Sequence, residues 1–255
     1  IVNRLWFVMM GRGLVEPLDL QHADNPPTHP ELLNLLASEF AAHDFDIRWF
    51  LGELARTKTY QRSSLLPQGA EPPRESYAVA LEKPVSAEQL FWSVGIATGR
   101  FEAVRRSLRN GAVTAKKSDD EIKAIDDATL EELVAKSDEL KSTRSDFITT
   151  FGNAPKEPET EFAPSVKGAL YLMHEARLQK CLSPGSSTLI ETLTEEADDQ
   201  VAVDQLFLTV LTRKPTNDER SELLAYFVTH KERRSEALTN LAWAMLTSTE
   251  FVVNH

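Results

Sequence analysis

The sequence predicts an all-α, multihelical, bundle-like domain with long loops and an acidic helical insertion. Apolar residues recur at helical spacing along most of the 255 residues. Alternating runs flanked by hairpin turns, which would predict strands, are missing from the sequence. Capping residues precede several of the apolar stretches, as they do at helix N-termini. Because 42% of the residues are hydrophobic, the chain can bury a substantial core.

The first segment, residues 1–66, begins with an apolar helical stretch and a glycine bend. Residues 1–10 predict a buried helix. Gly11 and Gly13 follow it, and glycine tolerates the positive φ that such a turn requires. A long loop is therefore expected from Gly11 to Pro27.

Two further helices are expected in this segment, which forms the N-terminal part of the helical core. Thr28 and Glu31 have the spacing of a capping box, which predicts a helix over about residues 30–42. Asp46 precedes the next apolar stretch and predicts the N-cap of a helix over about residues 47–57.

The middle segment, residues 67–160, predicts a linker followed by a helical, acidic insertion. Prolines between residues 67 and 84 indicate an extended surface connection, and Ser86 predicts the cap of the helix after it. Residues 118–146 carry ten acidic and four basic residues, a net charge of −6, while their apolar residues keep helical spacing. This pattern predicts amphipathic helices with a charged, solvated outer face.

The last segment, residues 161–255, predicts the C-terminal part of the helical core. Ser165 predicts the start of one helix, and residues 201–211 form a strongly apolar helical stretch. Thr216 and Glu219 repeat the capping-box spacing and predict the start of the next helix.

Charge and hydropathy argue against two classes of partner. The formal net charge of −11 disfavours nucleic acid, whose phosphates require a basic surface, and also an anionic membrane. No run approaches the roughly 18 consecutive apolar residues that a membrane span needs. No signal peptide is visible, and because the sequence begins at Ile1 in the middle of a helical pattern, we expect a fragment or a processed product.

Several short motifs occur together near the two ends of the chain. They are Asn3-Arg4-Leu5-Trp6, Gly11-Arg12-Gly13-Leu14-Val15, Pro27-Thr28-His29-Pro30-Glu31-Leu32-Leu33, Thr59-Tyr60-Gln61-Arg62-Ser63-Ser64, Leu206-Phe207-Leu208, Leu211-Thr212-Arg213-Lys214-Pro215-Thr216 and Trp243-Ala244-Met245-Leu246, with Ser248, Glu250-Phe251 and Asn254-His255. Together they resemble a planctomycete family that is catalogued as domain of unknown function 1553. The resemblance is closest over residues 1–66 and 200–255, so we expect these to pack together as the family core, with residues 86–182 as a helical addition.

The resemblance implies a C-terminal domain of a large exported protein that often carries a cytochrome-c-like haem domain upstream. An exported or periplasmic location is expected from the family, as are protein partners or upstream domains of the same precursor. No cofactor is expected in this chain, which has no CxxCH haem-attachment motif. The family has no established activity, so the resemblance transfers no catalytic residue.

Two classes of function remain open. The first is a non-enzymatic structural or interaction module of a larger exported, redox-linked assembly. The second is an uncharacterised enzyme or ligand-binding domain, with its site among polar residues near the glycine bend: Arg4, Arg12, Asp19, His22 and His29. Histidine and carboxylate together can bind a metal or transfer protons, and guanidinium binds carboxylate or sulfate.

The simpler interpretation of these residues is internal. Their spacing matches no standard ligand pattern, so no metal site is predicted. An arginine beside a glycine turn commonly pairs with an acidic side chain of its own chain, here Asp19 or Asp46. Asp19 and Asp24 would then solvate a loop, and His29 would hold the start of a helix by hydrogen bonds.

Other chemistry-bearing residues also have simple interpretations. The tryptophans at positions 6, 49, 92 and 243 lie in apolar helical stretches, so core packing is expected rather than a stacking platform. Cys181 has no local signature of a nucleophile, and His174 follows an apolar stretch. The acidic segment lacks the glycine that a calcium loop requires at its sixth position.

Overall fold

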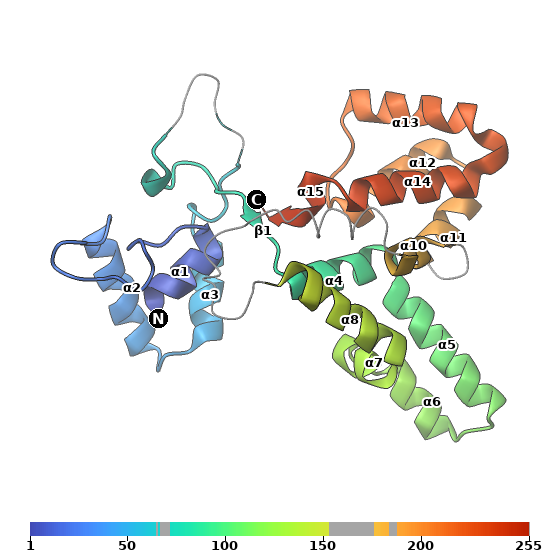
Figure 1. Ribbon diagram of the computed structural model, residues 1–255, viewed down its shortest axis with the longest axis horizontal. Helices are drawn as coiled ribbons and strands as arrows, with labels where there is room; N and C mark the ends of the chain where they lie inside the picture. Colours follow the sequence, from blue (N-terminus) through green and yellow to red (C-terminus); the bar gives the residue numbers. More distant parts are fainter. Residues whose placement is uncertain (65, 67–71, 153–175, 184–187, 255) are drawn as a thin grey trace. The chain divides into compact units, whose positions relative to one another are not determined.

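The structure, a computed structural model, describes residues 1–64, 66, 72–152, 176–183 and 188–254. These residues form an all-α, multihelical fold, as the sequence predicts (Figure 1). The chain divides into two compact units, one of Ile1–Lys83 with the last residues from Val253 onward, and one of Pro84–Val252. Within the described residues, the only strands are the paired β1 (Lys83–Pro84) and β2 (Val253–Asn254).

The first unit is built around α1 (Val2–Met10), α2 (Pro30–Ala42) and α3 (Ile47–Arg56), followed by the short 3₁₀ helix η1 (Arg74–Ser76). Helix α1 packs against both α2 and α3. The buried core comes from these helices, the loop after α1 and one residue beyond η1: Val2, Trp6, Met10, Leu14, Val15, Leu33, Phe40, Phe50, Leu54 and Tyr77. The proline-containing connection thus contributes Tyr77 to the core.

Local sequence explains where these helices begin and end. Gly11 adopts φ 79°, and its N–H donates to the carbonyl of Phe7 at 2.8 Å, which ends α1 as predicted. Asp46 caps α3 by accepting the Trp49 N–H at 3.0 Å, also as predicted. The predicted bounds of α2 are confirmed.

The predicted capping box at the start of α2 is wrong. The N-cap is His29, and its side chain makes no cap hydrogen bond. Thr28 instead donates its N–H and its hydroxyl to the carbonyl of Leu14, at 2.7 and 3.1 Å. A contact with the preceding loop therefore takes the hydroxyl that the sequence spacing assigned to the helix start.

In the second unit the described helices follow one another in this order: α4 (Ala87–Ala97), α5 (Arg100–Thr114), α6 (Asp119–Asp126), α7 (Leu130–Lys136), α8 (Asp138–Phe151), α10 (Ala176–Leu182), α11 (Thr188–Glu195), α12 (Asp199–Val210), α13 (Asn217–Thr229), η2 (Lys231–Arg233), α14 (Arg234–Leu246) and α15 (Thr249–Val252). Capping boxes begin α4, α6, α7 and α13. The box at Thr216 and Glu219 and the cap at Ser86 confirm the predictions made for them.

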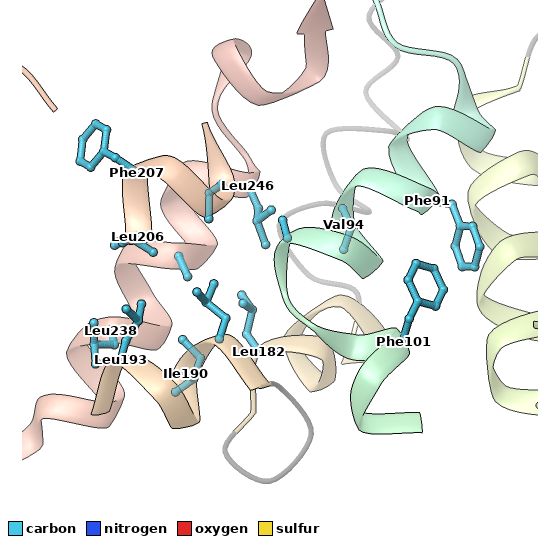
Figure 2. Close-up of a cluster of buried hydrophobic side chains, with 14 of the residues drawn as sticks. Phe91, Val94, Phe101, Leu182, Ile190, Leu193, Leu206, Phe207, Leu238 and Leu246 are labelled. Carbon is cyan, nitrogen blue, oxygen red and sulfur yellow. The ribbon is translucent and has the colours of Figure 1, made fainter. Parts of the chain in front are cut away.

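One hydrophobic core runs through the second unit. Figure 2 shows Ile190 and Leu193 beside Leu206 and Leu238, in a cluster that also includes Phe91 and Phe101 of α4 and α5. From the sequence we expect residues 86–182 to be an addition to a core made by the chain ends. In the structure, residues 200–252 share a core with helices from 86–195, because the inward faces of both groups are apolar. The expected packing of 1–66 against 200–255 stays a prediction.

The acidic segment forms amphipathic helices, as expected. Its apolar residues Leu133, Val134 and Leu140 are buried in the core of the second unit. Arg144 of α8 lies 2.8 Å from Glu88 and 3.1 Å from Glu131, which ties α8 to α4 and α7. Most of the segment's carboxylates face solvent, so its charge does not prevent burial of the inner face.

Some sequence-based expectations fall outside the described residues. The helix expected from Ser165, the histidine at position 174, and Pro67 and Gly69 of the expected linker all lie there. Within the described ranges, no helix combines the length and apolar character that crossing a membrane requires.

Candidate functional site

The residues of the predicted site all lie in the first unit, but their surroundings differ. Arg4 forms a bidentate ion pair with Asp19, with Nε 3.0 Å from Oδ1 and Nη2 2.5 Å from Oδ2. Both side chains are largely exposed. The pair joins α1 to the loop that follows it, which is the internal arrangement that the simpler interpretation expects.

His22 lies on the same loop and is exposed. Its Nδ1 accepts the backbone N–H of Asp24 at 3.2 Å, and a carboxylate oxygen of Asp24 lies 4.0 Å from the same nitrogen. These contacts stabilise a local turn in the loop. Among the residues that the structure describes, no group of three or more His, Cys, Asp or Glu side chains is placed to hold a metal ion.

The backbone of Arg12, in the bend that follows α1, and the ring of His29, at the start of α2, lie beside Tyr77. The Tyr77 hydroxyl donates to the carbonyl of Gly13 at 2.8 Å and lies 3.3 Å from the carbonyl of Arg12. The His29 ring is tilted toward the Tyr77 ring at a centroid distance of 5.8 Å, and Trp6 meets Tyr77 edge to face at 5.3 Å. Aromatic rings therefore form one wall of the bend.

One nitrogen donor at this bend, the Nε of Arg12, is buried and makes no hydrogen bond to the residues that the structure describes. The indole of Trp6 is buried as well, and it interacts with the Tyr77 hydroxyl. Buried donors in folded proteins are nearly always paired, with protein, water or a ligand. Within the described residues, the Arg12 Nε is therefore a buried donor without an acceptor.

Asn3 holds the backbone of the bend in place. Its Nδ2 donates to the carbonyls of Val15 and Leu18 at 2.9 and 3.0 Å, and its Oδ1 accepts the Val15 N–H at 3.0 Å. A Cβ added at Gly13 would lie 2.6 Å from the carbonyl oxygen of Val15, so the backbone approach there requires glycine. The side chains that surround Tyr77 thus stand on a fixed frame.

Charges near Tyr77 act in opposite directions. Burial raises the pKa of Tyr77, while hydrogen bonding with the Trp6 side chain and the positive charge of Arg12 lower it in part. The carboxylate of Glu16 acts against Arg12, and its Oε1 accepts the Gly13 N–H at 2.6 Å. With its pKa raised above 10.0, the phenol stays a neutral hydrogen-bond donor at neutral pH.

Lys83 is a second half-buried polar group of the first unit. Its Nζ donates to the carbonyl of Val8 at 3.2 Å and to that of Met9, and lies 5.6 Å from the centre of the Tyr60 ring. Burial lowers the pKa of Lys83. Because these carbonyls are the last of α1, the ammonium caps the C-terminal end of the helix dipole.

The chemistry-bearing residues of the second unit are engaged in packing and ion pairs. Cys181 is 9% exposed, and burial raises the pKa of its thiol to about 11, so it is a poor nucleophile at neutral pH. Arg213 holds Glu219 with contacts of 2.7 and 2.8 Å, and Glu250 with contacts of 2.5 and 3.0 Å. These bonds join the start of α13 to α15.

Tyr77 is not among the residues that the sequence singles out. Trp6 is 3% exposed, as the expected core packing requires, and its side chain interacts with Tyr77. Tyr77 lies in a proline-containing connection that carries no helical pattern, and it is 64 residues from its hydrogen-bond partner Gly13. The one signal in the sequence is that a large aromatic residue in a proline-containing connection tends to be buried.

Comparisons with known proteins point to one family. The sequence model of a family described as "protein of unknown function (DUF1553)" matches residues 1–227. No curated protein and no solved structure matches the chain.

Proposed function

The chain belongs to the family of proteins of unknown function described as DUF1553, and we propose that it is a helical structural or interaction module, not an enzyme, of a larger exported protein linked to a cytochrome-c-like haem domain. The observation that carries this proposal is that most of the polar side chains singled out in the sequence bind the chain's own backbone or carboxylates.

Three contacts illustrate this use of polar groups. Arg4 neutralises Asp19. Thr28 holds the carbonyl of Leu14. In the second unit, Arg213 is enclosed by two carboxylates and stacks over a phenyl ring. Groups that are bound in this way have no free capacity for acid–base chemistry, which supports a structural role.

The export and haem parts of the proposal rest on the resemblance of the motifs near both chain ends. A haem-bearing domain would lie in the same precursor and not in these 255 residues, which carry a single cysteine. The chain would then dock or position that domain.

The test is to isolate the natural full-length gene product. We expect a polypeptide longer than 255 residues that carries covalently attached haem and is recovered outside the cytoplasm. Intact mass, haem-dependent peroxidase staining and cell fractionation measure these properties. A haem-free, cytoplasmic product would contradict both parts of the proposal.

A ligand-binding or enzymatic role at Arg4, Arg12, Asp19, His22 and His29 is the second candidate, and one observation favours it. The buried Nε of Arg12 has no partner, whereas Arg4 and Asp19 satisfy each other. If His29 only positions the start of α2, His29→Ala lowers the melting temperature of the first unit. Unchanged melting together with a lost ligand response would favour the second candidate.

A further inference from the structure

A small cavity lies at the C-terminal end of α1, within the first unit. Its volume is about 60 Å³, and it is partly open to solvent. Met9, Tyr60, Tyr77 and Leu81 contribute apolar or aromatic surface to its lining, and Lys83 is the one charged residue among those that line it. An apolar lining with a few polar groups is the usual composition of a small-molecule site.

Two of the residues that line the cavity, Tyr77 and Lys83, are ionisable groups whose properties burial changes. Burial raises the pKa of the Tyr77 phenol and lowers the pKa of the Lys83 ammonium. Perturbed ionisable groups gather at functional sites, and here both lie at one cavity. The end of α1 is therefore a candidate binding site that the sequence motifs do not mark.

Lys83 places an unbalanced positive charge at the wall of this cavity. Its Nζ donates to the carbonyls of Val8 and Met9 and lies 5.6 Å from the centre of the Tyr60 ring. The end of a helix supplies only about half of an opposite charge. Burial is the one influence on the pKa of Lys83, so no carboxylate in the described part of the chain neutralises the ammonium. An anion in the cavity would supply the missing charge.

The wall that carries Tyr77 and Lys83 is already fixed to the rest of the unit. The Tyr77 hydroxyl donates to the carbonyl of Gly13 at 2.8 Å, and the N–H of Ala80 donates to the carbonyl of Ser63 at 3.1 Å. The Lys83 ammonium holds the same segment to the end of α1. A preorganised wall loses little freedom when a ligand binds, which favours affinity.

The volume and the lining together select the kind of ligand. About 10–15 Å³ of such space holds one water molecule, so the cavity accommodates a ligand of about four to six non-hydrogen atoms. An inorganic anion would leave the apolar lining without a partner. A carboxylate with a short alkyl tail matches both the ammonium and the apolar surface.

We propose that the cavity at the end of α1 binds a short-chain carboxylate of about two to four carbon atoms, with its carboxylate paired to Lys83 and its alkyl tail on the apolar lining. This inference goes beyond the proposed function and does not depend on it, since a structural module can also bind a small metabolite.

The experiment is an NMR titration of the chain, labelled with ¹³C at its methionine methyl groups, with sodium butyrate at constant ionic strength. The sequence has four methionines; Met9 and Met10 line the cavity, and Met245 of the second unit is an internal reference. Single methionine-to-leucine variants assign the signals. We expect a saturable shift of the Met9 or Met10 signal and no shift of the Met245 signal.

A neutral analogue tests the role of charge in the unmodified chain. Butyramide has nearly the shape of butyrate but carries no charge. It should bind at least about tenfold more weakly, the effect of losing one charge-assisted contact.

Three variants separate the cavity from general surface charge. Lys83→Met keeps the apolar stem but removes the ammonium, and should weaken butyrate binding to about the level of butyramide. Lys58→Met is the matched control, because Lys58 is an exposed lysine of the same unit, and it should leave binding unchanged. Ala80→Leu keeps the Lys83 charge but fills the cavity, so it should abolish binding of both compounds.

Three results would overturn the inference. They are the absence of a saturable Met9 or Met10 shift with butyrate, equal affinities for butyrate and butyramide, and an equal loss of binding in Lys83→Met and Lys58→Met. Circular dichroism of each variant checks its folding. If Lys83→Met does not fold, the comparison of butyrate with butyramide in the unmodified chain decides the question.

Discussion

The two compact units differ at one arginine: Arg4 of the first unit pairs with Asp19, as the arginines of the second unit pair with their neighbours, but Arg12 has no partner among the described residues. In the second unit, Arg213 binds two carboxylates, and one Nη of Arg105 donates to the carbonyls of Ile125, Asp126 and Ala128 at 3.0, 2.8 and 2.7 Å. Arg234 also has a buried Nε without a partner, but its other nitrogens reach Asp199 and the carbonyl of Glu196. In the first unit, Arg12 has no such partners among the described residues.

The helix starts of the two units also differ. The second unit begins several of its helices with complete capping boxes. In the first unit, Asp46 caps α3, but α2 begins at His29 without a side-chain cap. Backbone strain does not separate the units, because Tyr77 in the first and Thr212 in the second both adopt a positive φ, of 48° and 56°.

The largest expected effect tests whether the two cores are separate. Leu54→Ala in the first unit and Leu238→Ala in the second remove side chains that are 1% and 0% exposed. Each should lower the free energy of unfolding of its own unit by about 2–5 kcal/mol, because a cavity is left. Urea unfolding should show two transitions, and each variant should shift one of them.

Leu208→Ala serves as the control for that measurement, since Leu208 is 46% exposed and should change either transition little. A single transition that both core variants displace equally would contradict the division into two units.

The next effect concerns the arginine network of the second unit. Arg213→Ala leaves Glu219 and Glu250 without their shared partner and should destabilise the second unit by about 2 kcal/mol. Arg213→Lys should recover less than half of this, because a lysine cannot hold two carboxylates bidentately. Arg233→Ala is the control, since Arg233 is exposed and its one ion pair spans 3.5 Å. Chemical unfolding followed by circular dichroism measures all three.

A pH effect follows from the same network. The Arg213 hydrogen bonds lower the pKa of Glu219 from 4.5 to about 2. A depressed pKa in the folded state adds stability above the unfolded pKa, so this contribution is present above about pH 4.5 and is lost as the pH falls toward 2. The melting temperature of the second unit should fall across this window, and the fall should be shallower in Arg213→Ala.

The parts of the fold that could be predicted from sequence are those that depend on neighbours in the chain. The glycine at position 11, the cap at Asp46 and the box at Thr216 each act within a few residues, and the structure confirms all three. The capping box predicted at Thr28 is wrong because the Thr28 hydroxyl donates to the carbonyl of Leu14, 14 residues earlier in the chain. Local spacing carries no information about such competition.

The candidate site shows the same limit. The Arg4–Asp19 pair could be anticipated, because arginine and aspartate are complementary wherever a loop returns to its helix. The position of Tyr77 could not be anticipated. Its hydrogen bond to the carbonyl of Gly13 joins residues 64 positions apart, and the connection between them has no helical periodicity. The shared core of residues 86–195 and 200–252 could not be read from the sequence either, because amphipathic patterns show which face is buried but not against which partner.

The smallest expected effect is the sharpest test of the comparison between the units. Arg12→Met keeps most of the apolar stem and removes the unpaired buried donor. Without a ligand, the free energy of unfolding of the first unit should change by less than about 0.5 kcal/mol or increase, because removing an unsatisfied donor removes a desolvation cost. Arg213→Met, in contrast, should lose about as much stability as Arg213→Ala. If Arg12→Met were as damaging as Arg213→Met, Arg12 would be a structural residue like Arg213.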